Sequence, residues 1–139
     1  PSTISDLVAP LKEDPNIPMS TLKYRITDER EIDDPNHVKV VTDKEGFALF
    51  FSRSPIPFFR DSRSSQIYYK HLGFYAYRKD FLIEFGSLPV GDLESSEKLE
   101  QLRALENGFR IKVVETPFDS IEVDRPADIK RVEKFMASE

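Results

Sequence analysis

The sequence predicts a mixed α/β fold in which one sheet is flanked by helices. Apolar residues of the segment 3–13 recur at i, i+3, i+4 and i+7, which is the periodicity of an amphipathic helix. Residues 18–26 alternate apolar and polar side chains instead, as a half-buried strand does. The two periods keep alternating along the 139 residues, a length typical of one domain, so we expect residues 1–139 to form a single unit.

The opening helix is expected to begin at Ser2 or Thr3, whose hydroxyls suit an N-cap, and to end before Pro15. Pro10 lies inside the helical pattern. Because proline cannot donate the backbone hydrogen bond of a helix interior, we expect Pro10 to bend or shorten the helix.

A β-hairpin is expected next. Two apolar runs, 38–42 and 47–52, are separated by the turn-forming residues 43–46. The acidic segment 27–37 is expected to be an exposed excursion, and the stretch 53–65, with its prolines and charges, an irregular loop. Since loops often carry functional residues, this second stretch is a candidate region for a site.

The second half of the chain alternates strands with helices. The expected elements are, in order, a strand over 67–77, a helix over 79–86, a longer helix over 92–107, a strand over 109–113, a short β segment at 121–123 and a closing helix that Pro126 opens.

Composition excludes several classes of protein. A net charge of −5 argues against a nucleic-acid binder, whose affinity rests on clustered Lys and Arg. The chain has no run of about 18 apolar residues and no leader, so we expect neither a membrane span nor a signal peptide. The absence of cysteine is compatible with the cytoplasm and excludes thiolate metal ligands, and we expect any metal to be bound by oxygen atoms.

Asp124 lies between the expected β segment 121–123 and a helix, so its carboxylate is near a helix amino terminus. Ligand sites are common at this position in open α/β sheets. Asp124 could cap the helix, a role in which Asp is preferred. It could also bind Mg²⁺, which takes one or two carboxylates and leaves its other positions to water and phosphates.

His71 and Tyr75 are four residues apart in an expected strand, which puts both on one face together with Gly73. Gly73 would leave room for a ligand. Phe74 and Ala76 are expected on the opposite face. A core histidine hydrogen-bonded to the backbone is the competing interpretation of His71.

Two polar pairs are further candidates. Glu100 and Gln101 lie off the buried leucine stripe of the expected helix 92–107, where surface residues are ordinarily found. Arg53 and Arg60 flank a loop, and a guanidinium suits a carboxylate ligand, although a surface ion pair with Asp61 is also compatible with the sequence.

Five segments of the chain, in this order, resemble the carboxy-terminal portion of the CMP-Kdo synthetases, or 3-deoxy-manno-octulosonate cytidylyltransferases. They are PSTISDL, DPNHVKVVTDKEGFALFFSRSPIP, HLGFYAYR, LEQLRALENG and VDRPADI. The resemblance implies part of a nucleotide-diphospho-sugar-transferase-like α/β sandwich. It also implies a cytoplasmic enzyme that couples CTP to the sugar acid Kdo, releasing pyrophosphate and giving CMP-Kdo for lipopolysaccharide biosynthesis.

The resemblance assigns roles to the candidate residues. It makes Asp124 the metal-binding and catalytic residue, with Mg²⁺ as cofactor, and it implies a sugar site built from Arg53, Arg60, His71, Tyr75, Glu100 and Gln101. These types suit the substrate, because arginines can hold its carboxylate while mixed donors and acceptors bind its hydroxyls.

The sequence departs from the family at two points. Arg125 stands where the family usually has a helix-capping Thr. The family's phosphate loop and its Gln-Gly-Asp-Glu-Pro stretch are not found, so we expect a carboxy-terminal part that is inactive by itself. A non-catalytic sugar-acid-binding or dimerisation module, and a cytidylyltransferase for an amino-substituted Kdo-like sugar, are the alternatives.

A homodimer is expected from the aromatic content of the chain and, independently, from the resemblance. The stretch 38–77 carries more aromatic residues than a small core readily buries, and exposed aromatic residues are typical of interfaces. These aromatic residues are Phe47, Phe50, Phe51, Phe58, Phe59, Tyr68 and Tyr69. The resemblance independently implies a homodimer.

Overall fold

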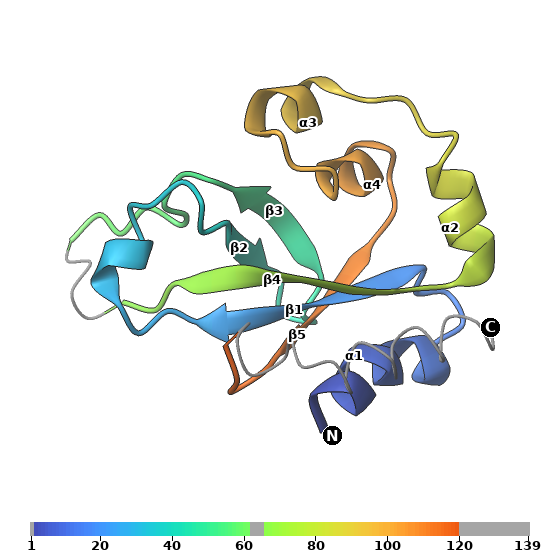
Figure 1. Ribbon diagram of the computed structural model, residues 1–139, viewed down its shortest axis with the longest axis horizontal. Helices are drawn as coiled ribbons and strands as arrows, with labels where there is room; N and C mark the ends of the chain where they lie inside the picture. Colours follow the sequence, from blue (N-terminus) through green and yellow to red (C-terminus); the bar gives the residue numbers. More distant parts are fainter. Residues whose placement is uncertain (1, 62–65, 120–139) are drawn as a thin grey trace.

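The computed structural model describes residues 2–61 and 66–119, which form a five-stranded mixed sheet with helices on both faces (Figure 1). The strands are β1 (Met19–Arg25), β2 (Lys39–Thr42), β3 (Ala48–Ser52), β4 (Tyr69–Tyr77) and β5 (Ile111–Glu115). The helices are α1 (Ser2–Glu13), the short 3-10 helix η1 (Glu29–Glu31), α2 (Lys79–Phe85), α3 (Asp92–Glu97) and α4 (Leu102–Glu106). The predicted mixed α/β class is therefore confirmed.

The strands follow the order β3-β2-β4-β1-β5, so the first strand of the chain lies inside the sheet, between β4 and β5. It pairs antiparallel with β4 and parallel with β5. The strands β2 and β3 pair as the predicted hairpin, and β2 meets β4 at a single residue pair, Lys39 with Lys70. Beyond this pair, β2 and β4 diverge.

Each face of the sheet carries its own apolar core. On one face α1 packs through Leu7, Val8 and Leu11 against residues that include Leu22 and Leu72. The other face is covered by α2, α3 and α4, which lie on the opposite side of the sheet from α1 (Figure 1). Two separate layers of helices thus enclose the sheet.

Pro10 does not shorten α1, which continues to Glu13. The expected shortening is wrong, because the apolar stripe on either side of the proline is buried against the sheet and keeps the helix in place. The carbonyl of Pro10 still accepts a hydrogen bond from the backbone N–H of Asp14 at 3.1 Å.

The single helix expected over 92–107 is also wrong. Lys98 adopts a left-handed conformation with φ 57° and ends α3, and a turn of three residues precedes α4. The expected stop at residues 107–108 is confirmed, since Gly108 has φ 84°. A left-handed backbone conformation costs free energy for a lysine. Other contacts must therefore stabilise the end of α3 at Lys98, and these contacts lie at the candidate site.

The remaining expectations need smaller changes. The last described strand is Ile111–Glu115 instead of 109–113. The excursion 27–37 contains η1 and a buried Ile32. The segment 121–123, Asp124 and the closing helix lie outside the described residues. Within residues 2–61 and 66–119, none of the helices is long and apolar enough to cross a membrane.

Candidate sugar site beside strand β4

A pocket of about 410 Å³ opens where β2 and β4 diverge. We call it the β4 pocket, and it is lined by Asn36, His37, Val38, residues 70–73, Leu99 and Gln101. Gly73 is exposed, and a Cβ atom placed on it would meet nothing within 4 Å. The room expected at Gly73 is therefore present in the structure.

His71 and Tyr75 share one face of β4, as predicted, with their ring centroids 5.4 Å apart. Phe74 and Ala76 pack on the opposite face with α1, also as predicted. Phe51 meets the His71 ring edge-on, at 4.9 Å between centroids. Tyr75 does not line the β4 pocket itself and reaches the site through its contact with His71.

The turn between α3 and α4 is fastened to the end of β3 by Arg53 and Glu97. The Glu97 carboxylate accepts hydrogen bonds from the Arg53 backbone N–H at 2.9 Å and from the Ser52 hydroxyl at 2.5 Å. In return, the Arg53 guanidinium donates to the carbonyls of Glu97 at 2.7 Å, Pro35 at 2.8 Å and Lys98 at 3.3 Å. We call this set the Arg53–Glu97 clamp, and it explains why the chain breaks at Lys98.

The clamp sets the position of the two following polar residues. Gln101 is buried, so its interpretation as a surface residue is wrong, whereas Glu100 is exposed. The Gln101 side-chain amide nitrogen lies 3.4 Å from His71 Nδ1. Glu100 lies close enough for its charge to act on Tyr75, whose pKa is raised first by burial and then by the neighbouring Tyr77 and Glu100.

His71 is electrically neutral near neutral pH. Its ring is enclosed by Phe51, Tyr75, Thr21 and Gln101. Desolvation in this environment lowers the pKa of His71 to about 4. The histidine therefore acts in the site as a fixed hydrogen-bonding group and not as a cation.

The two arginines predicted to bind a carboxylate have different surroundings. Arg53 belongs to the clamp, where three directed hydrogen bonds hold its guanidinium. Arg60 is exposed in the loop after β3. Neither side chain lines the β4 pocket, and their roles toward a ligand stay predictions.

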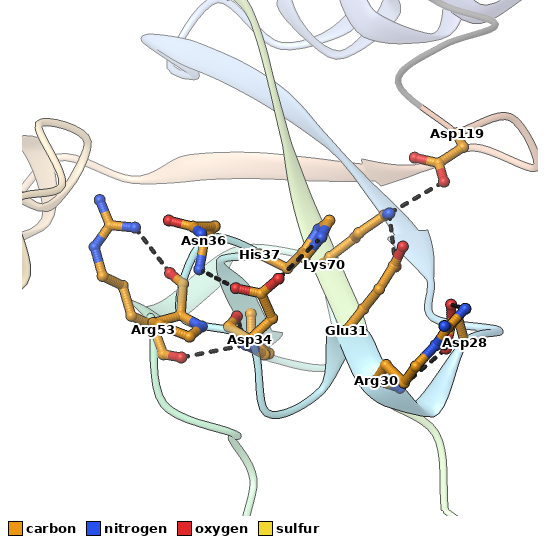
Figure 2. A network of polar contacts seen from close by, with 11 residues as sticks. Asp28, Arg30, Glu31, Asp34, Asn36, His37, Arg53, Lys70 and Asp119 are labelled. Carbon is orange, nitrogen blue, oxygen red and sulfur yellow. Dashed lines mark hydrogen bonds and ion pairs between the residues drawn. The ribbon is translucent and has the colours of Figure 1, made fainter.

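The pocket residues His37 and Lys70 belong to a network of polar contacts that also includes Glu31 of η1 (Figure 2). Lys70 lies between Glu31 and Asp119, at 2.8 and 3.0 Å. Burial alone would lower the pKa of Lys70, but the hydrogen bonds to these two carboxylates raise it. His37 Nε2 lies 3.7 Å from an oxygen of Asp34. In the described part of the chain, His, Asp and Glu side chains do not group in threes that could hold a metal ion.

Sequence reasoning missed Thr21, Glu97, His37 and Lys70. Thr21 is fully buried on β1, and its hydroxyl lies 2.9 Å from His71 Nε2. A buried threonine in a strand is ordinary, and the partner of Thr21 is 50 residues away. No local pattern marked Thr21, Glu97 or Lys70, because each acts through a contact between distant segments.

Residues 1–113 match the family model described as cytidylyltransferase. The chain belongs to the cytidylyltransferase family. It is 57% identical over 139 residues to the 3-deoxy-manno-octulosonate cytidylyltransferase of Solibacter usitatus, a match that covers 99% of this chain and 55% of that protein. The enzyme of the same name from Geobacter sulfurreducens is 53% identical, over 95% of this chain and 57% of its own length.

A solved structure has the same fold. It is that of CMP:2-keto-3-deoxy-manno-octonic acid synthetase complexed with CTP, which is 38% identical to this chain with a TM-score of 0.80. The match covers 99% of this chain and 56% of that one. This cytidylyltransferase chain thus spans a little over half the length of the relatives that it matches.

The lowered pKa of His71 predicts an acid-sensitive fold. Above about pH 6.5, the pKa of an unfolded histidine, His71 is neutral in both states. As the pH falls from 6.5 toward 4, the unfolded chain takes up a proton that the folded chain does not, so stability is lost. Between pH 7 and 5 we expect the wild type to lose about 2 kcal/mol more than His71→Gln, measured by urea unfolding.

The matched control is His37→Gln, since the chain has only two histidines. This variant keeps His71, so it should lose more stability between pH 7 and 5 than His71→Gln does. If His71→Gln lost as much stability between pH 7 and 5 as the wild type, the conclusion that His71 is enclosed and neutral in the folded protein would be wrong.

Proposed function

We propose that this chain is the carboxy-terminal, sugar-binding portion of a 3-deoxy-manno-octulosonate cytidylyltransferase. The proposed reaction couples CTP to the sugar acid Kdo and gives CMP-Kdo and pyrophosphate for lipopolysaccharide biosynthesis in the cytoplasm. Support comes from the names and identities of the relatives. The observation that carries the proposal is the contact of His71 with Gln101 at the wall of the β4 pocket.

The proposed role of these side chains is to bind and orient hydroxyl groups of the sugar. The β4 pocket mixes apolar lining with the amides of Asn36 and Gln101, which suits a ligand with several hydroxyls. His71 is a poor candidate for the base, because its pKa is low and Thr21 and Gln101 lie within reach of its two ring nitrogens. In the proposed reaction the sugar's anomeric hydroxyl attacks the α-phosphate of CTP and displaces pyrophosphate, so no covalent enzyme intermediate is required.

For the sugar carboxylate we propose the two arginines, with different contributions. The exposed Arg60 has the freedom to approach a ligand. Arg53 directs three of its five N–H groups at carbonyls, so it would contribute to a ligand mainly through its positive charge. Tyr75 and Glu100 complete the proposed sugar site.

We propose Mg²⁺ as the cofactor and Asp124 as its ligand in this chain. Asp124 lies outside the described residues, but one carboxylate fits the donor set of Mg²⁺, which leaves its other positions to water and phosphates. A bound Mg²⁺ would offset negative charge on the CTP phosphates.

We also propose a homodimer. Of the aromatic residues in the stretch 38–77, Phe47, Phe51 and Tyr68 belong to the core, whereas Phe58 is 86% exposed. The apolar Leu49 is 61% exposed on β3, an edge strand. These exposed apolar side chains are what supports a second copy as the partner.

The function is tested by pyrophosphate release from CTP in the full-length protein, with Kdo and its amino-substituted analogue as sugars. Gln101→Ala should raise the KM for Kdo about tenfold, the order expected for a lost buried hydrogen bond, and leave the KM for CTP unchanged. The matched control is Gln66→Ala, because Gln66 is exposed and lies outside the β4 pocket. No pyrophosphate release with Kdo would refute the function, and release only with the amino sugar would assign the alternative substrate.

Asp124→Asn separates the metal role from the capping role. Asn caps a helix about as well as Asp but brings no charge to Mg²⁺. We expect turnover of the full-length protein to fall by orders of magnitude while the melting temperature stays near that of the wild type. Near-normal turnover would leave Asp124 as a helix cap only.

A further inference from the structure

The Thr21 hydroxyl lies at an irregularity in the pairing of β1 with β4. Thr21 pairs with Tyr75 and Leu22 with Leu72, so Gly73 and Phe74 have no partner on β1. The Thr21 Oγ1 lies 2.7 Å from the Phe74 carbonyl and 3.2 Å from the Leu72 carbonyl. It is also 2.9 Å from His71 Nε2. One buried hydroxyl therefore serves three neighbours.

The proton count at this hydroxyl decides which nitrogen of His71 carries hydrogen. A threonine hydroxyl donates one hydrogen and accepts through its lone pairs, whereas a carbonyl only accepts. The Thr21 hydrogen therefore goes to the carbonyls of Phe74 and Leu72. The contact with His71 is then satisfied only if Nε2–H donates to Thr21 Oγ1, which leaves Nδ1 of the neutral ring as an acceptor.

The assignment extends from His71 to Gln101. An accepting Nδ1 takes a hydrogen from the Gln101 amide nitrogen, 3.4 Å away, and so selects one of the two orientations of that amide. The Gln101 carbonyl oxygen then points away from His71. Gln101 lines the β4 pocket, so an oxygen that points away from His71 can meet a ligand there.

We propose that Thr21 is a positioning residue for the β4 pocket, which fixes the His71 tautomer and through it turns the Gln101 carbonyl toward the ligand. The site then presents an acceptor at Gln101, so the ligand group that it reads is a donor, such as a sugar hydroxyl. This last step rests on the proposed function, whereas the tautomer does not.

Nitrogen NMR of the neutral histidine ring tests the assignment directly. With only two histidines, His37→Gln identifies the His71 signals. In the wild type at neutral pH, Nε2 of His71 should give the signal of a protonated nitrogen and Nδ1 that of an unprotonated one. The opposite pattern would overturn the proposal. This test needs no variant of Thr21, so its outcome does not depend on whether such a variant folds.

Variants of Thr21 test the coupling. Thr21→Val keeps the shape but removes the hydroxyl, and it should abolish the single tautomer, whereas Thr21→Ser should restore it. Thr116→Val is the matched control, because Thr116 is equally buried and its hydroxyl binds the backbone of Phe118 instead. An unchanged His71 tautomer in Thr21→Val would overturn the proposal.

The sugar-reading step has its own readout in the full-length protein. Thr21→Val should raise the KM for Kdo about tenfold with little change in kcat, and Thr21→Ser should recover the wild-type value. A changed tautomer with an unchanged KM would overturn the link to Gln101. If Kdo is not a substrate at all, the proposed function fails, while the NMR result still decides the tautomer.

Discussion

The hydrogen bonds between Arg53 and Glu97 join the end of β3 to the turn between α3 and α4, and the site depends on this joint. A charged carboxylate bound to a backbone N–H and a hydroxyl forms stronger hydrogen bonds than neutral pairs do. They offset the cost of the left-handed Lys98. Without the clamp, the continuous helical pattern of residues 92–107 would have no reason to break, and Gln101 would not be held against His71.

The face of β4 beneath this turn accounts for the chemistry that we propose. Phe51 and Tyr75 surround His71 with ring surfaces, so the imidazole stays neutral, and its two nitrogens are committed to Thr21 and Gln101. A neutral ring held in this way can orient the Gln101 side chain without adding a charge that would act on a nucleotide. The role that we propose for this site is therefore to bind and orient the sugar.

Local patterns predicted the parts of the fold that short segments determine. The hairpin of β2 and β3, the strand with His71 and Tyr75 on one face, and the helix stop at residues 107–108 follow from turn residues and period-two alternation. The break at Lys98 and the burial of Gln101 did not follow, because both depend on Arg53, more than 40 residues away. The resemblance had named Gln101 as a site residue, but only the structure shows its contact with His71.

The most direct test of this account is a double-mutant cycle in the full-length protein, with Glu97→Gln and Gln101→Ala as the two changes and the KM for Kdo as the readout. If the clamp acts by positioning Gln101, removing the charge of Glu97 should have little effect on the KM for Kdo in a protein that already lacks the Gln101 side chain. The account therefore predicts that the double variant has about the same KM as Gln101→Ala alone. A double variant whose KM for Kdo is raised by the product of the two single-variant factors would contradict it.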